Sequence, residues 1–438
     1  MAYDLKRKLV VQGLVKVENS GFSNLVLSSV IDSHGLTAQD KAFASKVFYG
    51  TIERKLTLNY ILQRFISKPL KKLDKEVVAI LQSGLYQILY MDSVPRHAAI
   101  NQAVELCSSF RKTSAKGLVN AVLRKAADFD ISQAIFSCEE ERVSVTYSVD
   151  REIVKIVMED YPDNYDNIFA AMFNSPAFTV NVNTVKITAQ DYRQMLHKAG
   201  IVYTDTELEN CIEIKASGAV TDIPGFREGY FFVQGITSRY AISAAGIQKG
   251  HNVLDLCAAP GGKSFAAARI LDNTGSIVSC DPNPSRLVLI ENGAERLGIT
   301  NITTQENLGQ NYRRDFCGKD VVICDVPCSG IGIIPKKPDL RYKSMGDLEN
   351  LYKVQQDILT TAARYVNEKG RIVYSTCTIN KKENEQQIEK FLSCHENFRL
   401  IQQICPIKGS INNDNMVTFL PSEGNCDGFF IAVLEKVW

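Results

Sequence analysis

Two cysteines, Cys328 and Cys377, have the residue type that covalent catalysis needs and positions that could bring them together. A thiolate attacks electrophilic carbon and forms a covalent intermediate. Each cysteine follows a short apolar run, residues 321–325 and 370–375, of the kind that forms a buried parallel strand. Because the carboxyl ends of parallel strands meet at one edge of a doubly wound sheet, both thiols are predicted to face one site. A lone cysteine at a strand end is usually a small apolar side chain of the core. Two cysteines at strand ends beside each other weaken that interpretation.

A third apolar run, residues 252–256, leads into the glycine-containing turn 257–263. Gly261 and Gly262 let the backbone approach a ligand without an intervening side chain. The ending Gly-Lys-Ser imitates a phosphate-binding P-loop, but that motif requires glycine where this chain has Cys257. The Gly-x-Gly-x-x-Gly dinucleotide fingerprint is also missing from the turn. The turn therefore disfavours an NTPase or an NAD enzyme.

Asp281 closes the next apolar run, residues 276–281, and a carboxylate at that point accepts hydrogen bonds from ribose hydroxyls. The alternative role for Asp281 is a helix cap ahead of Pro282 and Pro284, and this residue alone would favour the cap. Taken with the turn and the thiols, it indicates an adenosine-containing cofactor without an essential phosphate. S-adenosylmethionine meets that description.

The spacing of apolar residues predicts three domains that must position these groups. Residues 1–135 repeat apolar positions every three or four residues, which predicts an all-α domain. Residues 136–240 mix short strands with a helix, as expected for a small α+β linker domain. Residues 241–438 alternate strands and helices, which predicts an α/β, Rossmann-like doubly wound sheet.

The bulk composition indicates a cytoplasmic protein with no membrane partner. No apolar run reaches the length of about 18 residues that a membrane-spanning helix needs. The first residues lack the apolar core of a secretory signal. The twelve cysteines include no Cys-x-x-Cys pair and the five histidines are scattered, so reduced thiols are expected, with neither a disulfide framework nor a metal site.

Charge is distributed unevenly along the chain. Residues 1–130 carry 19 Lys and Arg against 11 Asp and Glu, a net charge of +8, while the remaining residues carry 31 against 38, a net charge of −7. A basic N-terminal part is typical of a domain that meets a polyanion, and also of a basic surface that is merely solvated. Composition leaves both possibilities open.

Three ordered motifs resemble those of the RNA cytosine-C5 methyltransferases of the NOL1/NOP2/Sun family. They are Asp255-Leu-Cys-Ala-Ala-Pro-Gly-Gly-Lys263, Asp325-Val-Pro-Cys-Ser-Gly and Ser375-Thr-Cys-Thr, and the run 427–434 resembles the family's closing strand. Residues 99–106 and 117–125 are similar to the antitermination factor NusB. The resemblance implies a NusB-like domain ahead of an S-adenosylmethionine-dependent methyltransferase domain. It also implies 16S ribosomal RNA as the partner, no DNA, and a monomeric enzyme.

The resemblance further implies a role for each matching residue. Cys377 would be the nucleophile that attacks carbon 6 of cytosine, Cys328 would assist product release, and Asp325 would face the base and the cofactor. Lys263 is a further catalytic candidate, because nearby positive charge lowers the pKa of a thiol. The cofactor-binding set that the resemblance implies is Cys257, Ala258, Ala259, Pro260, Gly261, Gly262, Lys263, Asp281, Asn307 and Asp325.

Two positions depart from the family pattern. The family usually has an aspartate near the end of the strand at 302–305, where it contacts adenine, and this chain has Asn307 there, with Glu306 as a rival. The segment 233–238 lacks the acidic residue that often follows glutamine in the family. Both departures concern contacts to cofactor or substrate and leave the reaction unaffected.

Two other functions compete with RNA methylation. A DNA cytosine-C5 methyltransferase would use Cys328 as its nucleophile, and a non-catalytic RNA-binding factor would keep the fold without the activity. The Thr-Cys motif at Cys377 and the NusB-like domain speak against the first, and the full set of reactive residues speaks against the second. A stacked, paired cytosine is not accessible to a thiol, so the target base should be unpaired or extruded. The charged run 336–341 after the Pro-Cys loop is predicted to contact RNA, with a merely exposed loop as the alternative.

Overall fold

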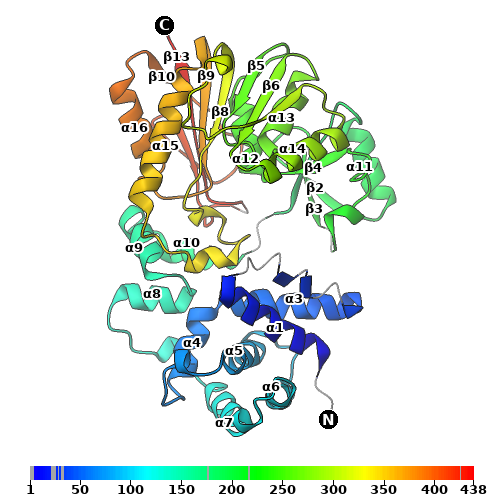
Figure 1. Cartoon of the computed structure of the whole chain (residues 1–438), viewed down its shortest axis with the longest axis vertical. Helices are drawn as coiled ribbons and strands as arrows, with labels where there is room; N and C mark the ends of the chain where they lie inside the picture. Colours follow the sequence, from blue (N-terminus) through cyan, green and yellow to red (C-terminus); the bar gives the residue numbers. More distant parts are fainter. Residues whose placement is uncertain are drawn as a thin grey trace. The chain divides into compact units, whose positions relative to one another are not determined.

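The computed structural model describes residues 4–20, 26–27, 29–30, 34–174, 177–215, 218–424 and 426–438. The chain divides into two compact units, whose elements are labelled in Figure 1. The first unit comprises residues 1–159 and the short segment 337–344, and the second comprises residues 160–336 and 345–438. The domain limits expected after residues 135 and 240 stay predictions, since the division into two units tests neither of them.

Helices build the first unit, as predicted for an all-α domain. They are α1 (Leu5–Ser20), α3 (Ala38–Glu53), α4 (Lys55–Gln63), α5 (Lys75–Tyr90), α6 (Arg96–Ser109), α7 (Lys116–Ala126), α8 (Glu139–Tyr147) and α9 (Arg151–Asp160), with 3-10 turns at Leu70–Lys72, Thr113–Ala115, Ile131–Gln133 and Pro338–Tyr342. Helix α5 is buried along most of its length and contacts α1, α3, α4, α6 and α7, because its sequence is largely apolar on all sides. Gly50 on α3 permits this packing, since a Cβ there would lie 2.0 Å from the ring of Tyr86 on α5.

The segment 337–344 is separated in sequence from the rest of the first unit and is firmly held in it. Arg341 is fully buried, and its Nη1 donates a hydrogen bond to the carbonyl oxygen of Tyr147 at 2.9 Å. The carbonyl oxygen of Arg341 accepts a hydrogen bond from the N–H of Asp150 at 2.8 Å. The prediction that residues 336–341 contact RNA is therefore wrong for Arg341, whose guanidinium is not accessible.

The second unit contains a small antiparallel sheet, in agreement with the predicted α+β linker domain. Its strands are β1 (Thr179–Val182), β2 (Val202–Asp205), β3 (Cys211–Lys215) and β4 (Phe231–Val233), in the order β2-β3-β1-β4, accompanied by α10 (Tyr165–Ala171), α11 (Ala189–Lys198) and a 3-10 turn at Val220–Asp222. Tyr192 and Leu196 on α11 are fully buried against the apolar side chains of this sheet.

The larger sheet of the second unit carries the candidate site. Its parallel part runs in the order β9-β8-β5-β6-β7. These strands are β5 (Asn252–Asp255), β6 (Ser276–Asp281), β7 (Ile302–Glu306), β8 (Lys319–Asp325) and β9 (Val366–Thr376). Antiparallel β13 (Phe429–Lys436) pairs with β9, and β10 (Phe398–Leu400), β12 (Met416–Phe419) and β11 (Ser410–Asn413) extend the sheet beyond it. The strand order reverses between β5 and β8, and ligands of doubly wound sheets bind at the carboxyl ends beside such a reversal.

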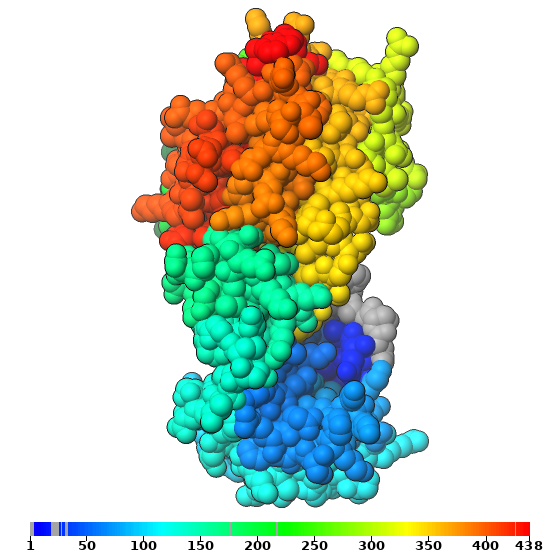
Figure 2. Space-filling view, turned by 90° about the vertical axis from the view of Figure 1, so that its left-hand side faces the viewer, coloured from blue at the N-terminus to red at the C-terminus, as the bar shows by residue number. Residues whose placement is uncertain are grey.

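Helices cover both faces of this sheet, which confirms the predicted doubly wound fold (Figure 1). One layer contains α12 (Ile236–Ala244), α13 (Gly262–Leu271) and α14 (Pro284–Leu297), and the other contains α15 (Leu348–Ala363) and α16 (Glu385–Cys394). Short 3-10 turns lie at Arg314–Phe316 and Ile331–Ile333. Figure 2 shows the outer surface of the α15 and α16 layer in yellow and orange.

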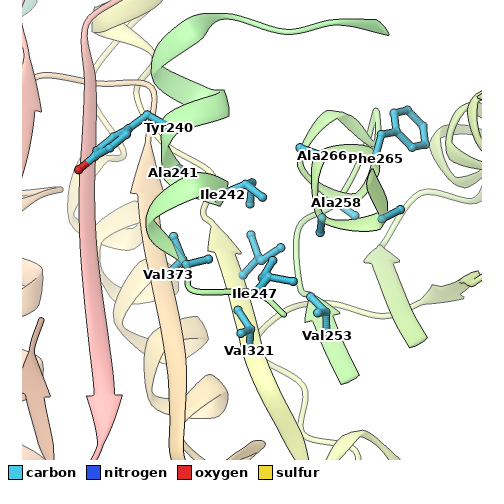
Figure 3. Close-up of a cluster of buried hydrophobic side chains, with 14 of the residues drawn as sticks. Tyr240, Ala241, Ile242, Ile247, Val253, Ala258, Phe265, Ala266, Val321 and Val373 are labelled. Carbon is cyan, nitrogen blue, oxygen red and sulfur yellow. The ribbon is translucent and has the colours of Figure 1, made fainter. Parts of the chain in front are cut away.

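Successive residues of each strand point to opposite faces and so join different layers. Val253 of β5 packs in the cluster with α12 and α13, whereas Leu254 packs in the cluster with α15 and α16. Figure 3 shows the first cluster, where Val321 and Val373 from β8 and β9 lie with the helical residues. Among the described residues, no helix is long and apolar enough to span a bilayer.

Candidate active site

The two cysteines lie side by side at the carboxyl ends of neighbouring strands. Cys377 directly follows β9, and Cys328 lies on the loop that leaves β8. These strands are paired in parallel, with Asp325 opposite Ser375. The two sulfur atoms are 3.1 Å apart, and both side chains are half-buried. The structure therefore brings the two thiols together at one partly accessible position.

Cys328 is set up to remain a thiol. Its hydrogen bond with Cys377 is the largest cause that raises the pKa of the Cys328 thiol well above its ordinary value, followed by burial and by the negative charge of neighbours that include Glu383. Because the thiolate is the reactive form, Cys328 is poorly suited to be the nucleophile at neutral pH. Burial likewise raises the pKa of Cys257, on the turn after β5.

An ion pair stands at the end of β8, between Lys263 and Asp325. The Nζ of Lys263 is 2.7 Å from Oδ2 of Asp325, while Oδ1 of Asp325 accepts a hydrogen bond from the hydroxyl of Ser375 at 2.8 Å. Lys263 also donates to the hydroxyl of Ser238 at 3.0 Å and lies 5.2 Å from the ring centre of Phe429. The sequence suggested Lys263 as the positive charge that lowers the pKa of a nearby thiol. In the structure its ammonium group is paired directly with Asp325.

The turn 257–263 joins β5 to α13 at the same edge of the sheet. Gly261 has a φ of +108°, and a Cβ on it would lie 2.6 Å from the ring of Phe265, so this position requires glycine. The N–H of Ala258 donates to the carbonyl oxygen of Cys280 on β6 at 2.8 Å, which fixes the turn beside β6. Helix α13 begins directly after Gly261, and a helix N-terminus presents backbone N–H groups to a ligand.

Asp281, at the end of β6, is buried and tied to the turn. Its Oδ1 accepts a hydrogen bond from the N–H of Asn283 at 2.9 Å, and its Oδ2 is 2.9 Å from Nη1 of Arg286. Nη2 of Arg286 donates to the carbonyl oxygen of Ala259 at 2.6 Å, a link that sequence reasoning missed. The capping role belongs to Asn283, whose side chain accepts the N–H of Ser285 at the start of α14.

Asn307 and its rival Glu306 differ in burial at the end of β7. Asn307 is buried, whereas Glu306 is exposed. The Nδ2 group of Asn307 donates to the carbonyl oxygens of Leu308 at 2.8 Å and Asn311 at 3.1 Å. With its amide hydrogens used inside the loop, Asn307 presents Oδ1 as an acceptor, which matches the amino group of adenine. Which of Asn307 and Glu306 contacts adenine stays a prediction.

Asp255 is a fully buried carboxyl group beneath the turn, and the sequence analysis assigns it no separate role. Its Oδ2 accepts a hydrogen bond from the hydroxyl of Ser264 at 2.8 Å, and Ser264 is also bonded to the hydroxyl of Ser279 at 2.8 Å. Burial raises the pKa of Asp255 to about 7. Strand β5 and helix α13 are therefore joined by a carboxyl group that titrates near neutral pH.

We expect the stability of the fold to depend on pH through Asp255. Its pKa of about 7 in the folded state lies above the ordinary value of 3.8, so the stabilising contribution of the protonated carboxyl group is complete only below 3.8 and is lost progressively as the pH rises to about 7. The substitution Asp255→Asn should remove this loss, which amounts to about 2–4 kcal/mol. Thermal midpoints at about pH 5 and about pH 8 check this, and the wild type should lose more than the variant. Equal losses would contradict the assignment.

Family models match three stretches of the chain. Residues 244–435 match the model described as 16S rRNA methyltransferase RsmB/F. Residues 5–128 match the NusB family, and residues 153–221 match the ferredoxin-like domain described as Methyltr_RsmF/B-like. The order of these matches is that of the helical part, the small antiparallel sheet and the large sheet.

Similarity to curated relatives extends over nearly the whole length. The "Probable ribosomal RNA small subunit methyltransferase B" of Bacillus subtilis is 30% identical over 450 residues, covering 98% of each chain. The "Ribosomal RNA small subunit methyltransferase B" of Proteus mirabilis is 29% identical over 442 residues, covering 99% of each. The solved structure of PH0851 covers all of both chains with a TM-score of 0.84 at 22% sequence identity, a likeness of fold.

Proposed function

The chain belongs to the 16S rRNA methyltransferase RsmB/F family, and from this premise we propose that it transfers a methyl group from S-adenosylmethionine to carbon 5 of a cytosine in 16S ribosomal RNA. The observation that carries the proposal is the pair of thiols, Cys328 and Cys377, with sulfur atoms 3.1 Å apart. Methylation of carbon 5 needs a nucleophile at carbon 6 and a group that assists its release. Methyl transfer to a ring nitrogen or a hydroxyl needs neither.

The residues around the turn fit an adenosine-containing cofactor. Gly261 leaves the turn open to close approach, and the buried carboxylate of Asp281 can accept hydrogen bonds from ribose hydroxyls. In the proposed site the turn 257–263 holds the ribose and methionine side, Asn307 contacts adenine, and Asp325 lies at the reacting end. S-adenosylmethionine supplies the methyl group when bound.

Removing the charge of Asp281 should weaken cofactor binding. A hydrogen bond to a charged group contributes about 1.5–3 kcal/mol, so Asp281→Asn should raise the Kd for S-adenosylhomocysteine about 10- to 100-fold. Titration calorimetry measures this. Glu306→Gln is the matched control, because Glu306 is paired opposite Asp281 on the neighbouring strand but is exposed. A large loss in Glu306→Gln together with normal binding by Asn307→Ala would instead assign the adenine contact to Glu306.

In the proposed first step, the thiolate of Cys377 adds to carbon 6 of the target cytosine. The new sulfur–carbon bond displaces the electron pair of the ring double bond onto carbon 5, which becomes nucleophilic toward the methyl group. The protonated carboxyl group of Asp325 stabilises the ring by donating a hydrogen bond to N3, where negative charge develops. Lys263 and Ser375, which contact opposite oxygens of Asp325, hold that carboxyl group in place.

In the proposed second step, the enzyme is regenerated. A base removes the proton from carbon 5, the electron pair restores the ring double bond, and the bond between carbon 6 and Cys377 breaks to release the thiolate. Cys328 lies in hydrogen-bond contact with Cys377 and assists this release as a proton donor to the departing sulfur. Keeping Cys328 protonated is therefore an advantage for the second step.

The need of the Cys377 thiol to reach the target base restricts the RNA structures on which the enzyme can act. Because the thiol must reach the face of the ring, the cytosine is unpaired or extruded when it reacts. We propose that the basic N-terminal unit binds phosphates around this base. The proposed setting is a cytoplasmic monomer that acts on RNA and not on DNA.

The proposal is tested by methyl transfer from labelled S-adenosylmethionine to unmodified 16S ribosomal RNA, followed by digestion to nucleosides. The expected product is 5-methylcytidine. Label in another nucleoside would refute the assigned atom, and label in DNA alone would favour a DNA methyltransferase. Absence of transfer to any nucleic acid, with RNA still bound, would favour a non-catalytic binding factor.

A further inference from the structure

A fully buried carboxylate, that of Glu383, lies between the loops that carry the two cysteines, and the mechanism above does not use it. Its Oε2 accepts hydrogen bonds from the backbone N–H of Ser329 at 2.8 Å and from Nε2 of Gln355 at 2.9 Å. Its Oε1 accepts a hydrogen bond from Nδ2 of Asn380 at 3.0 Å. A buried carboxylate is costly unless several donors replace water, so this group determines where its partners lie.

Two of these donors fix the loop of Cys328. Ser329 directly follows Cys328 in the chain, and its backbone N–H is held by the carboxylate. Nε2 of Gln355 on α15 donates both to Glu383 and to the carbonyl oxygen of Pro327, at 2.9 Å in each case. The residues on either side of Cys328 are therefore held by one charged group and one amide.

The third donor and two further bonds connect this loop to Cys377. Asn380 lies on the segment that follows Cys377. The hydroxyls of Ser329 and Thr378, each next in sequence to one of the cysteines, are 2.7 Å apart. The N–H of Gly332 donates to the carbonyl oxygen of Cys377 at 3.1 Å. The spacing of the two thiols is thus set by a buried network whose charged member is Glu383.

We propose that Glu383 is a positioning residue of the methyl-transfer site, which holds the thiol of Cys328 against Cys377 and so controls the release step. The inference rests on the proposed function. A role in stability alone would predict something different: loss of Glu383 would lower the thermal midpoint and leave the chemistry of Cys328 in the remaining folded protein unchanged.

The surroundings of the carboxylate support an electrostatic part in this role. The negative charge of Glu383 is one of the causes that raise the pKa of Cys328, after the hydrogen bond to Cys377 and burial. The other titratable groups that face it are phenols. The hydroxyl of Tyr374 donates to the backbone carbonyl oxygen of Glu383 at 2.7 Å, and Tyr352 lies close enough for the carboxylate to raise its pKa, although burial is the larger cause.

The first test measures the reactivity of the Cys328 thiol. The variant Glu383→Gln keeps the size of the side chain and removes its charge. Alkylation of Cys328 by iodoacetamide, followed by peptide mass spectrometry across pH, should show a lower midpoint than in the wild type, because a negative charge that raises the pKa of Cys328 is gone. Glu383→Asp keeps the charge and should stay close to the wild type. The matched control is Glu385→Gln, because the carboxylate of Glu385 accepts from the hydroxyl of Thr418 instead.

The second test measures how much covalent RNA–protein adduct accumulates during turnover. In Glu383→Gln we expect a covalent RNA–protein adduct that survives denaturation to increase about tenfold over wild type, with an unchanged KM for S-adenosylmethionine, because a misplaced Cys328 slows release. A variant with the wild-type alkylation profile and wild-type adduct level, altered only in thermal midpoint, would overturn the proposal. Alkylation needs neither RNA nor cofactor. If the wild type is inactive in methyl transfer but the alkylation midpoints of wild type and Glu383→Gln still differ, the proposed function is refuted and the effect of Glu383 on Cys328 is not.

Discussion

Replacing Cys377 by serine is expected to abolish methyl transfer, with kcat lowered about 10⁴-fold or more. Serine preserves the shape of the side chain, but its hydroxyl does not ionise near neutral pH, so the addition to carbon 6 has no nucleophile. The turn 257–263 is untouched by this change, and S-adenosylhomocysteine should bind as tightly as it does to the wild type. Transfer of labelled methyl groups to unmodified 16S ribosomal RNA measures the first quantity, and calorimetry measures the second.

The control for this experiment is Cys394→Ser, which removes an exposed thiol on α16 and should keep full activity. An active Cys377→Ser protein beside an inactive Cys328→Ser protein would reverse the assignment. Cys328 would then be the nucleophile, and the chemistry would be that of the DNA cytosine methyltransferases.

Replacing Cys328 by serine is expected to trap the reaction halfway, with most of the enzyme covalently attached to RNA. The thiol of Cys328 lies 3.1 Å from the sulfur that must leave, close enough to donate its proton to that sulfur. Without it, the addition and the methyl transfer still occur, but the bond between Cys377 and carbon 6 breaks slowly. Denaturing gel electrophoresis should show a slowly migrating RNA–protein species, and turnover should fall about 100-fold or more.

Two comparisons make this second expectation specific. The double variant Cys328→Ser/Cys377→Ser should form no adduct, because the attacking thiol is gone. RNA in which the target cytosine has been replaced by uridine should form much less adduct with the single variant. An adduct that persists in the double variant would arise from another cysteine and would contradict the assigned roles.

The position of the thiols was predictable because their strands are buried and parallel. The runs 321–325 and 370–375 are apolar without alternation, which is typical of a strand covered on both faces, and parallel strands end at a common edge. The turn 257–263 could be placed at the same edge for the same reason. The thiols and the turn lie close together because of the order and direction of the strands. Short-range sequence patterns are sufficient to predict buried parallel strands of this kind.

Elements with weaker patterns escaped prediction. Helix α15 buries Gln355, Ile358, Leu359, Thr361, Ala362 and Ala363, and the two polar members interrupt the apolar stripe by which a helix is identified. Strands β10, β11 and β12 contain three or four residues each, which is too few for a period of two to be read. They are defined by their antiparallel pairing with one another and with β13, and that pairing is a long-range property.

Two fully buried charged residues escaped prediction for a different reason. Charged side chains are expected on the surface, whereas Glu383 and Arg341 are fully buried. Their partners come from distant segments: Glu383 receives the N–H of Ser329, and Arg341 donates to the carbonyl oxygen of Tyr147. No local pattern encodes such contacts, so the predicted RNA contact of Arg341 failed and the role of Glu383 went unseen.

Because residues 337–344 belong to the first unit and the chain on both sides of them belongs to the second, the polypeptide passes between the units at three places, 159–160, 336–337 and 344–345. The hydroxyl of Tyr342 donates to the carbonyl oxygen of Ile52 at 2.6 Å and accepts the N–H of Lys55 at 3.0 Å. A fragment that begins at residue 160 would carry Tyr342 without these partners. Exchanging the helical unit for that of a relative therefore requires replacing both residues 1–159 and the eight residues 337–344. A chimera joined only after residue 159 would combine the helices of one protein with the segment 337–344 of another.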